Sequence, residues 1–328
     1  MKIRKSRIFR KENGASREDA HRLLLERMDL EKQAIDILQT FAGNEPYQLG
    51  YSGGKDSDVI LHLAKKSGVA FKAVHNLTTV DAPETVRYVK SKKDVIIEYP
   101  KMSMWQLIVK HKTPPTRLFR YCCEELKERS GIGKKLITGV RKAESRKRAE
   151  NQGVVTFTKP NKEIKNSVDN ENFLLTTAGG VVVLNYENSD SHRMVENCYR
   201  TSKTLINPIL NWDDDFLWWY IRHEGIEINP LYKGGCPGGC NRIGCIGCPM
   251  GGKNRWKEFE QYPKYKEAYL RAFDRMLKYR QECGNKDVIG WKNAQGVFDW
   301  WMEDKNIDGQ YSMDFDGTDL VGFKEKGI

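Results

Sequence analysis

Hydrophobic positions in the first half of the chain form two alternating patterns: short apolar runs typical of buried strands, and longer stretches with helical spacing. A helix is predicted first, over residues 17–40. Strands are predicted at residues 46–52, 69–77, 94–100 and 134–140. The helical stretches between them cover residues 57–67, 82–92 and 102–112. Strands that alternate with helices indicate right-handed βαβ units, so the sequence predicts an α/β fold built on a parallel sheet.

The pattern changes over residues 151–200, where three short β-favouring runs are joined by Asn, Asp and Gly turns. We interpret this segment as a small antiparallel insertion on the sheet, not as a separate domain. A helix is predicted over 211–225, with Asp213 or a neighbour as its N-cap. After a loop rich in Gly, Pro and Cys, a long helix is predicted over 255–283, and Pro263 interrupts it early.

These elements predict a doubly wound parallel sheet flanked by helices, with the β insertion and a helical, Cys-rich C-terminal region. Three parts of the chain are expected. A basic N-terminal arm and helix cover residues 1–44, an α/β domain covers 45–232, and the Cys-rich loop and C-terminal helices cover 233–328.

Composition adds a preference for anionic partners. Lys and Arg number 55 against 44 Asp and Glu, which gives a formal net charge of +11 over 328 residues. Such a balance favours partners that carry phosphate, from nucleotides to nucleic acids. No apolar run has transmembrane length and no apolar segment follows the basic start. We therefore predict a cytoplasmic protein without a membrane partner.

The first candidate site is the loop "SGGKDS" between a predicted strand and a predicted helix. Its residues are Ser52, Gly53, Gly54, Lys55, Asp56 and Ser57. Free backbone N–H groups and the helix dipole favour an anion at a helix N-terminus. The glycines let a phosphate approach the backbone, Lys55 adds a cation, the two serines add hydroxyl donors, and Asp56 either helps to hold Mg²⁺ or shapes the loop. The spacing is not that of the common P-loop.

A second candidate, "GVRKAESRKR", follows the fourth predicted strand. Its predicted anion-binding residues are Arg141, Glu144, Ser145 and Arg146. Guanidinium groups recognise phosphate or sulfate oxygens through paired donors. Because both candidates follow parallel strands, they are expected at the same edge of the sheet.

The eight cysteines are clustered, which in a cytosolic chain indicates a metal or redox centre more than a disulfide framework. Cys245 and Cys248 have the Cys-x-x-Cys spacing that places two thiolates on one ion or cluster. Cys122 and Cys123 form an adjacent pair. Zinc remains an alternative to iron–sulfur, because the sequence separates the two poorly.

Several segments, in matching order over roughly residues 45–280, resemble one family. They are "YSGGKDS", "DAPETVRYV", "RYCCEELK", "GVRKAESRKR", "INPILNWDDDFLWWYIRHEGIEINPLY" and "GCIGCP". The first resembles the PP-loop of the ATP pyrophosphatase (adenine nucleotide alpha hydrolase-like) superfamily. The others resemble motifs of its PAPS reductase branch.

The resemblance implies an iron–sulfur centre. In that family the two cysteine pairs converge on a 4Fe–4S cluster, so Cys122, Cys123, Cys245 and Cys248 become the implied ligands. Cys198, Cys236 and Cys240 are further cysteines that could replace one of them. Cys283, in "QECGN", resembles in part the segment that carries the nucleophile of sulfonucleotide reductases, but Asn285 and Lys286 depart from it.

Two reactions fit these features. In the favoured one, ATP is cleaved to AMP and pyrophosphate so that an acceptor is activated for sulfur transfer, with Lys55, Asp56 and Arg141 as catalytic residues and Mg²⁺ on the ATP. In the other, a cysteine attacks adenylyl sulfate or PAPS, and sulfite is released. A third hypothesis is a nucleic-acid-binding accessory with a structural zinc site. A sulfur donor protein and a nucleic-acid acceptor are the other expected partners.

Overall fold

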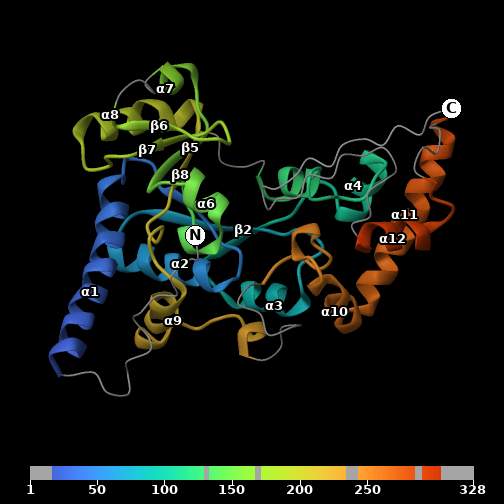
Figure 1. Cartoon of the computed structure of the whole chain (residues 1–328), viewed down its shortest axis with the longest axis horizontal. Helices are drawn as coiled ribbons and strands as arrows, with labels where there is room; N and C mark the ends of the chain where they lie inside the picture. Colours follow the sequence, from blue (N-terminus) through green and yellow to red (C-terminus); the bar gives the residue numbers. More distant parts are fainter. Residues whose placement is uncertain (1–16, 129–132, 167–170, 234–242, 285–289, 304–328) are drawn as a thin grey trace, which may run out of the picture.

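The computed structural model describes residues 17–128, 133–166, 171–233, 243–284 and 290–303. Figure 1 shows a central sheet with helices around it and a helical region at one end of the molecule. Several features noted in the sequence lie outside the described residues. They are the basic arm before residue 17, Cys236, Cys240, Asn285, Lys286 and the tail after residue 303.

One eight-stranded sheet forms the centre of the fold, in the order β3-β2-β1-β4-β8-β5-β7-β6. Five strands run parallel: β1 (Tyr47–Gly50), β2 (Phe71–Asn76), β3 (Val95–Glu98), β4 (Lys135–Ile137) and β8 (Lys203–Ile206). The four strands predicted from the first half of the chain are confirmed as β1 to β4. The parallel strand β8 was not predicted.

The insertion extends the same sheet, as predicted. Its strands are β5 (Val155–Lys159), β6 (Phe173–Leu175) and β7 (Val181–Val183). β5 pairs antiparallel with β8 and with β7, and β7 pairs antiparallel with β6. The helix α8 (Ser189–Cys198) also lies in this segment and was not predicted.

Helices flank the sheet and build the far end of the molecule. The longer ones are α1 (Arg17–Thr40), α2 (Lys55–Ser67), α3 (Pro83–Ser91), α4 (Met104–His111), α9 (Asp214–His223), α10 (Asn254–Gln261), α11 (Pro263–Glu282) and α12 (Ala294–Glu303). The shorter ones are α5 (Tyr121–Cys123), the π-helix η1 (Glu124–Glu128), η2 (Lys142–Glu144), α6 (Arg146–Asn151), α7 (Lys162–Asn166), η4 (Tyr199–Thr201), η5 (Pro230–Lys233) and η6 (Pro249–Gly251). Asp213 caps α9 as predicted, because its side chain accepts a hydrogen bond from the Phe216 N–H at 2.7 Å. Pro263 separates α10 from α11.

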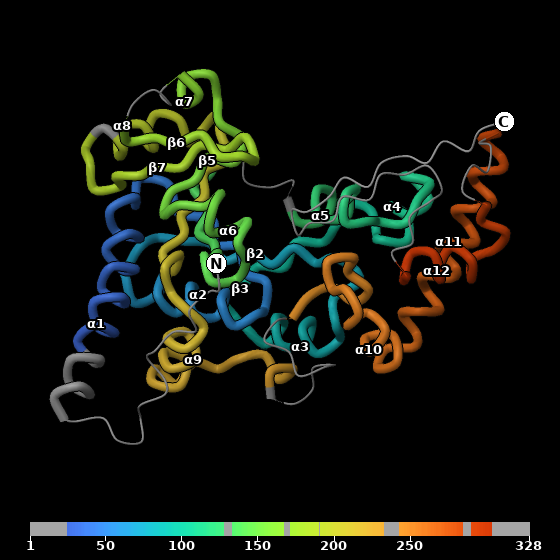
Figure 2. The backbone as a smooth tube through the Cα atoms, in the orientation of Figure 1, coloured from blue at the N-terminus to red at the C-terminus, as the bar shows by residue number. Residues whose placement is uncertain are grey.

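The buried side chains form two hydrophobic cores. The first lies between the sheet and the helices α1, α2 and α9, and includes Leu49, Ile60 and Trp212. The second joins α4 and the Cys122 segment to α10, α11 and α12, around Tyr269 and Trp301. Figure 2 shows α11 and α12 beside α4 at one end of the chain's path, and α11 packs against both. The C-terminal helices therefore share a core with the segment that carries the first cysteine pair.

Among the described residues, no helix has both the length and the apolar character that crossing a bilayer requires.

Candidate active site

The glycine loop lies where the sequence predicts it, between the end of β1 and the start of α2. Gly53 has a φ of +74°, and a Cβ there would lie 2.9 Å from Val89 Cγ2 of α3. Glycine is therefore required by both backbone conformation and packing. Ser57 closes the turn, since its hydroxyl donates to the Gly54 carbonyl at 2.7 Å and accepts from the Gly54 N–H at 3.0 Å. The bare backbone and the N-terminus of α2 make this loop suited to an anion.

Two residues far along the chain hold the loop in place, and neither was predicted as part of the site. The buried Asn229 side chain donates to the Gly53 carbonyl at 3.0 Å and to Thr85 Oγ1 at 3.1 Å. The Tyr232 hydroxyl accepts from the Lys55 N–H at 3.2 Å. Both belong to the "NPLY" segment, which resembles a family motif. That resemblance was the feature of the sequence that could have identified them as site residues.

A network of four charged side chains lies beside the loop. Lys55 is buried, with its ammonium 3.1 Å from Asp56 and 4.0 Å from Asp214. Arg141 is 1% exposed and donates from Nε to Asp56 at 2.6 Å and from a terminal nitrogen to Asp214 at 2.7 Å. A second terminal nitrogen donates to the Trp212 carbonyl at 3.2 Å. The structure thus brings Lys55, Asp56 and Arg141 together, and adds Asp214, which the sequence did not indicate.

This network changes the interpretation of two side chains. Asp56 pairs with both Lys55 and Arg141, which favours the loop-shaping role over a ligand for Mg²⁺. Arg141 is oriented by two carboxylates and a carbonyl, and the nearby carboxylates raise its pKa against the opposing effect of burial. Its nearest partners are therefore protein groups.

The rest of the arginine block is arranged around a turn. Glu144 accepts from the Arg141 N–H at 3.1 Å and from the Arg148 guanidinium. Ser145 caps α6 by accepting from the Arg148 N–H at 3.3 Å. The Arg146 side chain is 90% exposed and pairs with Glu150 at 2.7 Å. Anion binding by Glu144, Ser145 and Arg146 stays a prediction.

Behind the loop, α2 buries a carboxyl group. The Tyr51 hydroxyl donates to Asp58 at 2.5 Å, while the second carboxyl oxygen of Asp58 has no partner in the described part of the chain. Burial raises the pKa of Asp58 to about 7, although the hydrogen bond from Tyr51 opposes the rise.

The raised pKa of Asp58 predicts a specific pH dependence of stability. In the unfolded chain this carboxyl has a pKa of about 3.9, so between about pH 4 and pH 7 the folded state binds more protons than the unfolded state. The free energy of unfolding therefore falls as pH rises through that window, by up to about 4 kcal/mol from this one group. Asp58→Asn, which cannot ionise, should remove that part of the slope. Urea unfolding from pH 4.5 to 7.5 measures it.

The control for this experiment is Asp94→Asn. Asp94 is exposed, and its pKa is lowered by the hydrogen bond from Lys65. If wild type and Asp58→Asn had the same pH slope, Asp58 would not be the group responsible.

The two cysteine pairs come together beside the carboxyl end of β2. Cys122 and Cys123 form α5, and Cys245 pairs in a β-bridge with Asp81 of the segment after β2. The Ile246 N–H donates to the Val80 carbonyl at 2.8 Å, and Cys245 Sγ lies 3.5 Å from Thr78 Oγ1. Since β2 neighbours β1, the cysteine group and the glycine loop share one edge of the sheet.

The four thiols affect one another's pKa electrostatically. The pKa of Cys122 is raised by its hydrogen bond with Cys123, by burial and by the other thiols. Burial raises the pKa of Cys248, and Cys245 adds to the rise. Lys127 is the neighbouring cation, and its pKa is raised chiefly by Cys245, to which its side chain is hydrogen-bonded. The sequence did not single out Lys127.

The four cysteine thiols are donors of the chemical type that soft metal centres bind. Four thiolates are the donors of structural zinc sites and of iron–sulfur clusters. All four cysteines are free thiols, and within the described ranges no three side chains of ligand type stand close enough to hold one ion. The four thiols are therefore near enough to raise one another's pKa, but among the described residues no three of them are arranged around one ion.

Two further cysteines lie elsewhere. Cys198 ends α8 and contacts Glu163 and Met194, both within the insertion. Cys283 is exposed at the end of α11. Neither contacts a member of the four-cysteine group among the interactions of the described residues.

Comparison with known proteins gives both sequence and structure relatives. Sulfate adenylyltransferase subunit 2 of Nocardia farcinica is 26% identical over 219 residues, which is 65% of this chain and 68% of that protein. An uncharacterised protein of Methanocaldococcus jannaschii is 24% identical over 288 residues, covering 83% of this chain but only 57% of its own length.

Two solved structures are also similar to this chain. Phosphoadenylyl-sulfate (PAPS) reductase from Candida auris, in a phosphate complex, has a TM-score of 0.37 and 18% identity over 70% of this chain and 96% of its own. FMN adenylyltransferase from Candida glabrata, with FMN and an ATP analogue, has a TM-score of 0.39 and 12% identity over 68% of this chain and 65% of its own.

The family itself is given by a model described as the phosphoadenosine phosphosulfate reductase domain, which matches residues 46–250. That range is more than half of the chain. It contains the glycine loop, the arginine block and both cysteine pairs. The chain therefore belongs to the phosphoadenosine phosphosulfate reductase domain family.

Proposed function

We propose that this protein is an enzyme of nucleotide-dependent sulfur metabolism that binds ATP at residues 52–57 and cleaves it to AMP and pyrophosphate. The observation that carries this proposal is the buried ammonium of Lys55 at the N-terminus of α2, directly after the two glycines Gly53 and Gly54. A buried cation at the N-terminus of a helix suits a polyphosphate better than a single sulfate. The likeness to sulfate adenylyltransferase subunit 2 supports nucleotide chemistry linked to sulfur.

The reaction follows from this arrangement. An acceptor oxygen attacks the α-phosphorus of ATP, the bond between that phosphorus and the bridging oxygen breaks, and pyrophosphate leaves with its electrons. A sulfur nucleophile then displaces AMP from the activated acceptor. Lys55 neutralises charge that develops on the leaving group, and Mg²⁺ bound to ATP would add to this effect, while Arg141 acts by holding Asp56 and Asp214 in place.

The four-cysteine group is proposed to hold a 4Fe–4S cluster, with zinc as the alternative. The ligands would be Cys122, Cys123, Cys245 and Cys248. When bound, an iron–sulfur cluster supplies electron or sulfur transfer and a local charge near the nucleotide. Lys127, beside Cys245, would balance the negative charge of the thiolates.

A second candidate function is reduction of a sulfonucleotide with release of sulfite. The family match favours it, as do the paired cysteines. Against it, Cys283 lies at the end of the helix α11, and Asn285 and Lys286 after it depart from the segment that carries the nucleophile of sulfonucleotide reductases. A thiol nucleophile at Cys283 stays a prediction.

One set of assays separates the two functions. Anaerobically purified protein is incubated either with ATP, Mg²⁺ and a panel of acceptors, or with adenylyl sulfate or PAPS and a thiol. Acceptor-dependent pyrophosphate release supports the proposed function. Sulfite release that is lost in Cys283→Ser, without pyrophosphate release, would replace it with the reductase. The same panel tests nucleic acid as the acceptor, and binding that falls steeply with salt would support that partner.

The cluster proposal makes its own prediction. Cys245→Ser should remove most of the iron and acid-labile sulfide, together with the broad visible absorbance of an iron–sulfur protein, because it deletes one of four ligands. Cys283→Ser is the matched control, since it changes an exposed thiol at the end of α11 and should keep the full iron content. Stoichiometric zinc in colourless, anaerobically prepared wild type would contradict the cluster and leave the zinc alternative.

A further inference from the structure

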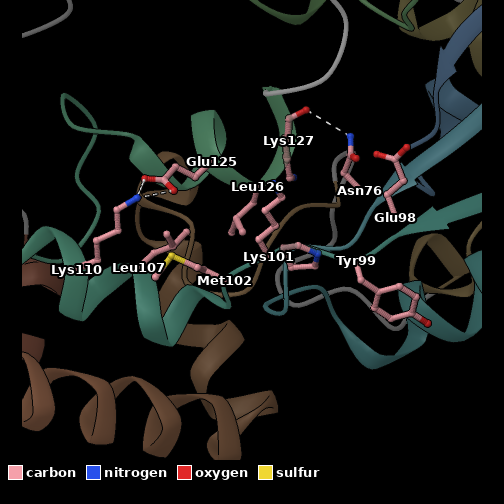
Figure 3. Close-up of a pocket in the computed structure, with 11 residues that line it drawn as sticks. Asn76, Glu98, Tyr99, Lys101, Met102, Leu107, Lys110, Glu125, Leu126 and Lys127 are labelled. Atoms are coloured by element: carbon pink, nitrogen blue, oxygen red, sulfur yellow. Dashed lines mark hydrogen bonds and ion pairs between the residues drawn. The ribbon is translucent and has the colours of Figure 1, made fainter.

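A cavity of about 430 Å³ lies beside the cysteine group and is not explained by the glycine loop. Figure 3 shows its walls, which come from the ends of β2 and β3, the loop after β3, the helix α4 and the π-helix η1. None of residues 52–57 is among the lining residues. The volume falls in the range of small-molecule sites, and the carboxyl ends of parallel strands are where such sites form.

One part of the cavity is apolar. Met102, Leu107 and Leu126 lie together on the side of α4, as Figure 3 shows. Tyr99 also lines the cavity, but Figure 3 shows its ring pointing away from these three side chains. An apolar floor suits a flat ring system, which loses little conformational entropy when it binds.

The charged lining groups differ in whether they already have partners. Lys110 is paired with Glu125 at 2.8 Å, so the charges of these two side chains already balance each other. Glu98 and Lys101, by contrast, have no side-chain hydrogen bond or ion pair with any residue in the described part of the chain. The open side of the cavity therefore offers one carboxylate acceptor and one ammonium donor.

Lys127 links this cavity to the chemistry proposed for the cysteine group. It is one of the lining residues, and its carbonyl accepts a hydrogen bond from Asn76 at 3.4 Å. Its neighbour Leu126 also lines the cavity and packs in the same hydrophobic core as Cys122. A ligand in the cavity would therefore be separated from the four-cysteine group only by side chains of η1.

We propose that this cavity binds the sulfur acceptor as a nucleotide unit, a flat base with N–H donors attached to a phosphate, either free or within a nucleic-acid chain. The base lies on the apolar floor, Glu98 accepts from its N–H groups, and Lys101 pairs with its phosphate. Identification of the ligand as the acceptor rests on the proposed function, whereas its binding does not.

The test is therefore equilibrium binding without ATP or catalysis. The probes are the cytidine, guanosine and uridine 5′-monophosphates and short single-stranded oligonucleotides of the same bases, which separate a free nucleotide from one within a chain. Glu98→Gln and Lys101→Ala should each weaken binding of the preferred probe about tenfold or more, because each removes a charge-assisted contact. Lys72→Ala, an exposed lysine at the opposite end of β2, is the matched control and should bind as wild type does.

The outcomes are distinct. Binding of a mononucleotide or an oligonucleotide that depends on Glu98 and Lys101 but not on Lys55 supports the proposal. Absence of binding by all probes overturns it, as does binding that is lost in Lys55→Ala and retained in Lys101→Ala. Competition by ATP would also overturn it, because the cavity would then be an extension of the site at residues 52–57. Failure of pyrophosphate release with intact probe binding would refute the proposed function alone.

Discussion

Lys55→Ala is expected to lower acceptor-dependent pyrophosphate release about 100-fold or more, the usual cost of removing a charged group aimed at developing negative charge. The side chain is 5% exposed, so its ammonium acts in a site with little water, where charge is weakly screened. Asp56 and Asp214 hold it at 3.1 and 4.0 Å, and it is therefore oriented before the substrate arrives. Pyrophosphate release at saturating ATP measures the loss.

Two further variants make this result specific. Lys55→Met keeps the apolar stem of the side chain but not the charge, so a loss equal to that of alanine assigns the effect to the ammonium. Lys65→Ala changes an exposed lysine in the last turn of the same helix, paired with Asp94, and should retain wild-type activity. Activity of Lys55→Met within about twofold of wild type would mean that the charge does not contribute to catalysis.

The sequence predicted the elements whose patterns are local and strong. The strands β1 to β4 stand in apolar runs between helices, and the glycine loop is a contiguous motif at a strand-to-helix boundary. The strand β8 was missed because it begins with the polar residues Lys203 and Thr204, which leaves no continuous apolar run. Its pairing partner β4 lies almost 70 residues earlier, and it is this pairing that buries Thr204. The helix α8 was missed because "SDSHRMVENC" is mostly polar.

The same limit applies to the site. Asn229 and Tyr232 contact the loop across 176 and 177 residues of chain, and no local pattern reveals such contacts. Arg141 was predicted as an anion ligand because it follows a strand. The structure places it between Asp56, 85 residues away, and Asp214, 73 residues away, and this pairing follows from the sheet order and not from the motif. The sequence thus indicated which residues to consider as a candidate site, while the partners of their charges required the fold.

Gly247→Ala is expected to destabilise the protein by about 3–5 kcal/mol. The new side chain would strain a left-handed backbone conformation, and its Cβ would overfill a packed core. Gly247 has a φ of +73° and lies between Cys245 and Cys248. A Cβ there would lie 2.7 Å from Phe259, 3.0 Å from Trp301 and 3.1 Å from Tyr269. These rings cannot move away, because they pack against one another in the second hydrophobic core.

Gly68→Ala separates the two contributions. Gly68 ends α2 with the same φ of +73°, but a Cβ there meets nothing within 4 Å, so this variant carries the backbone strain alone and should lose only about 1–2 kcal/mol. Urea unfolding of both variants gives the difference, which measures the packing of the aromatic rings over the Cys-x-x-Cys turn. If the two variants lost equal stability, the rings would have room for a methyl group. The turn would then owe its shape to backbone conformation alone, and the second core could not be what holds Cys245 and Cys248 toward Cys122.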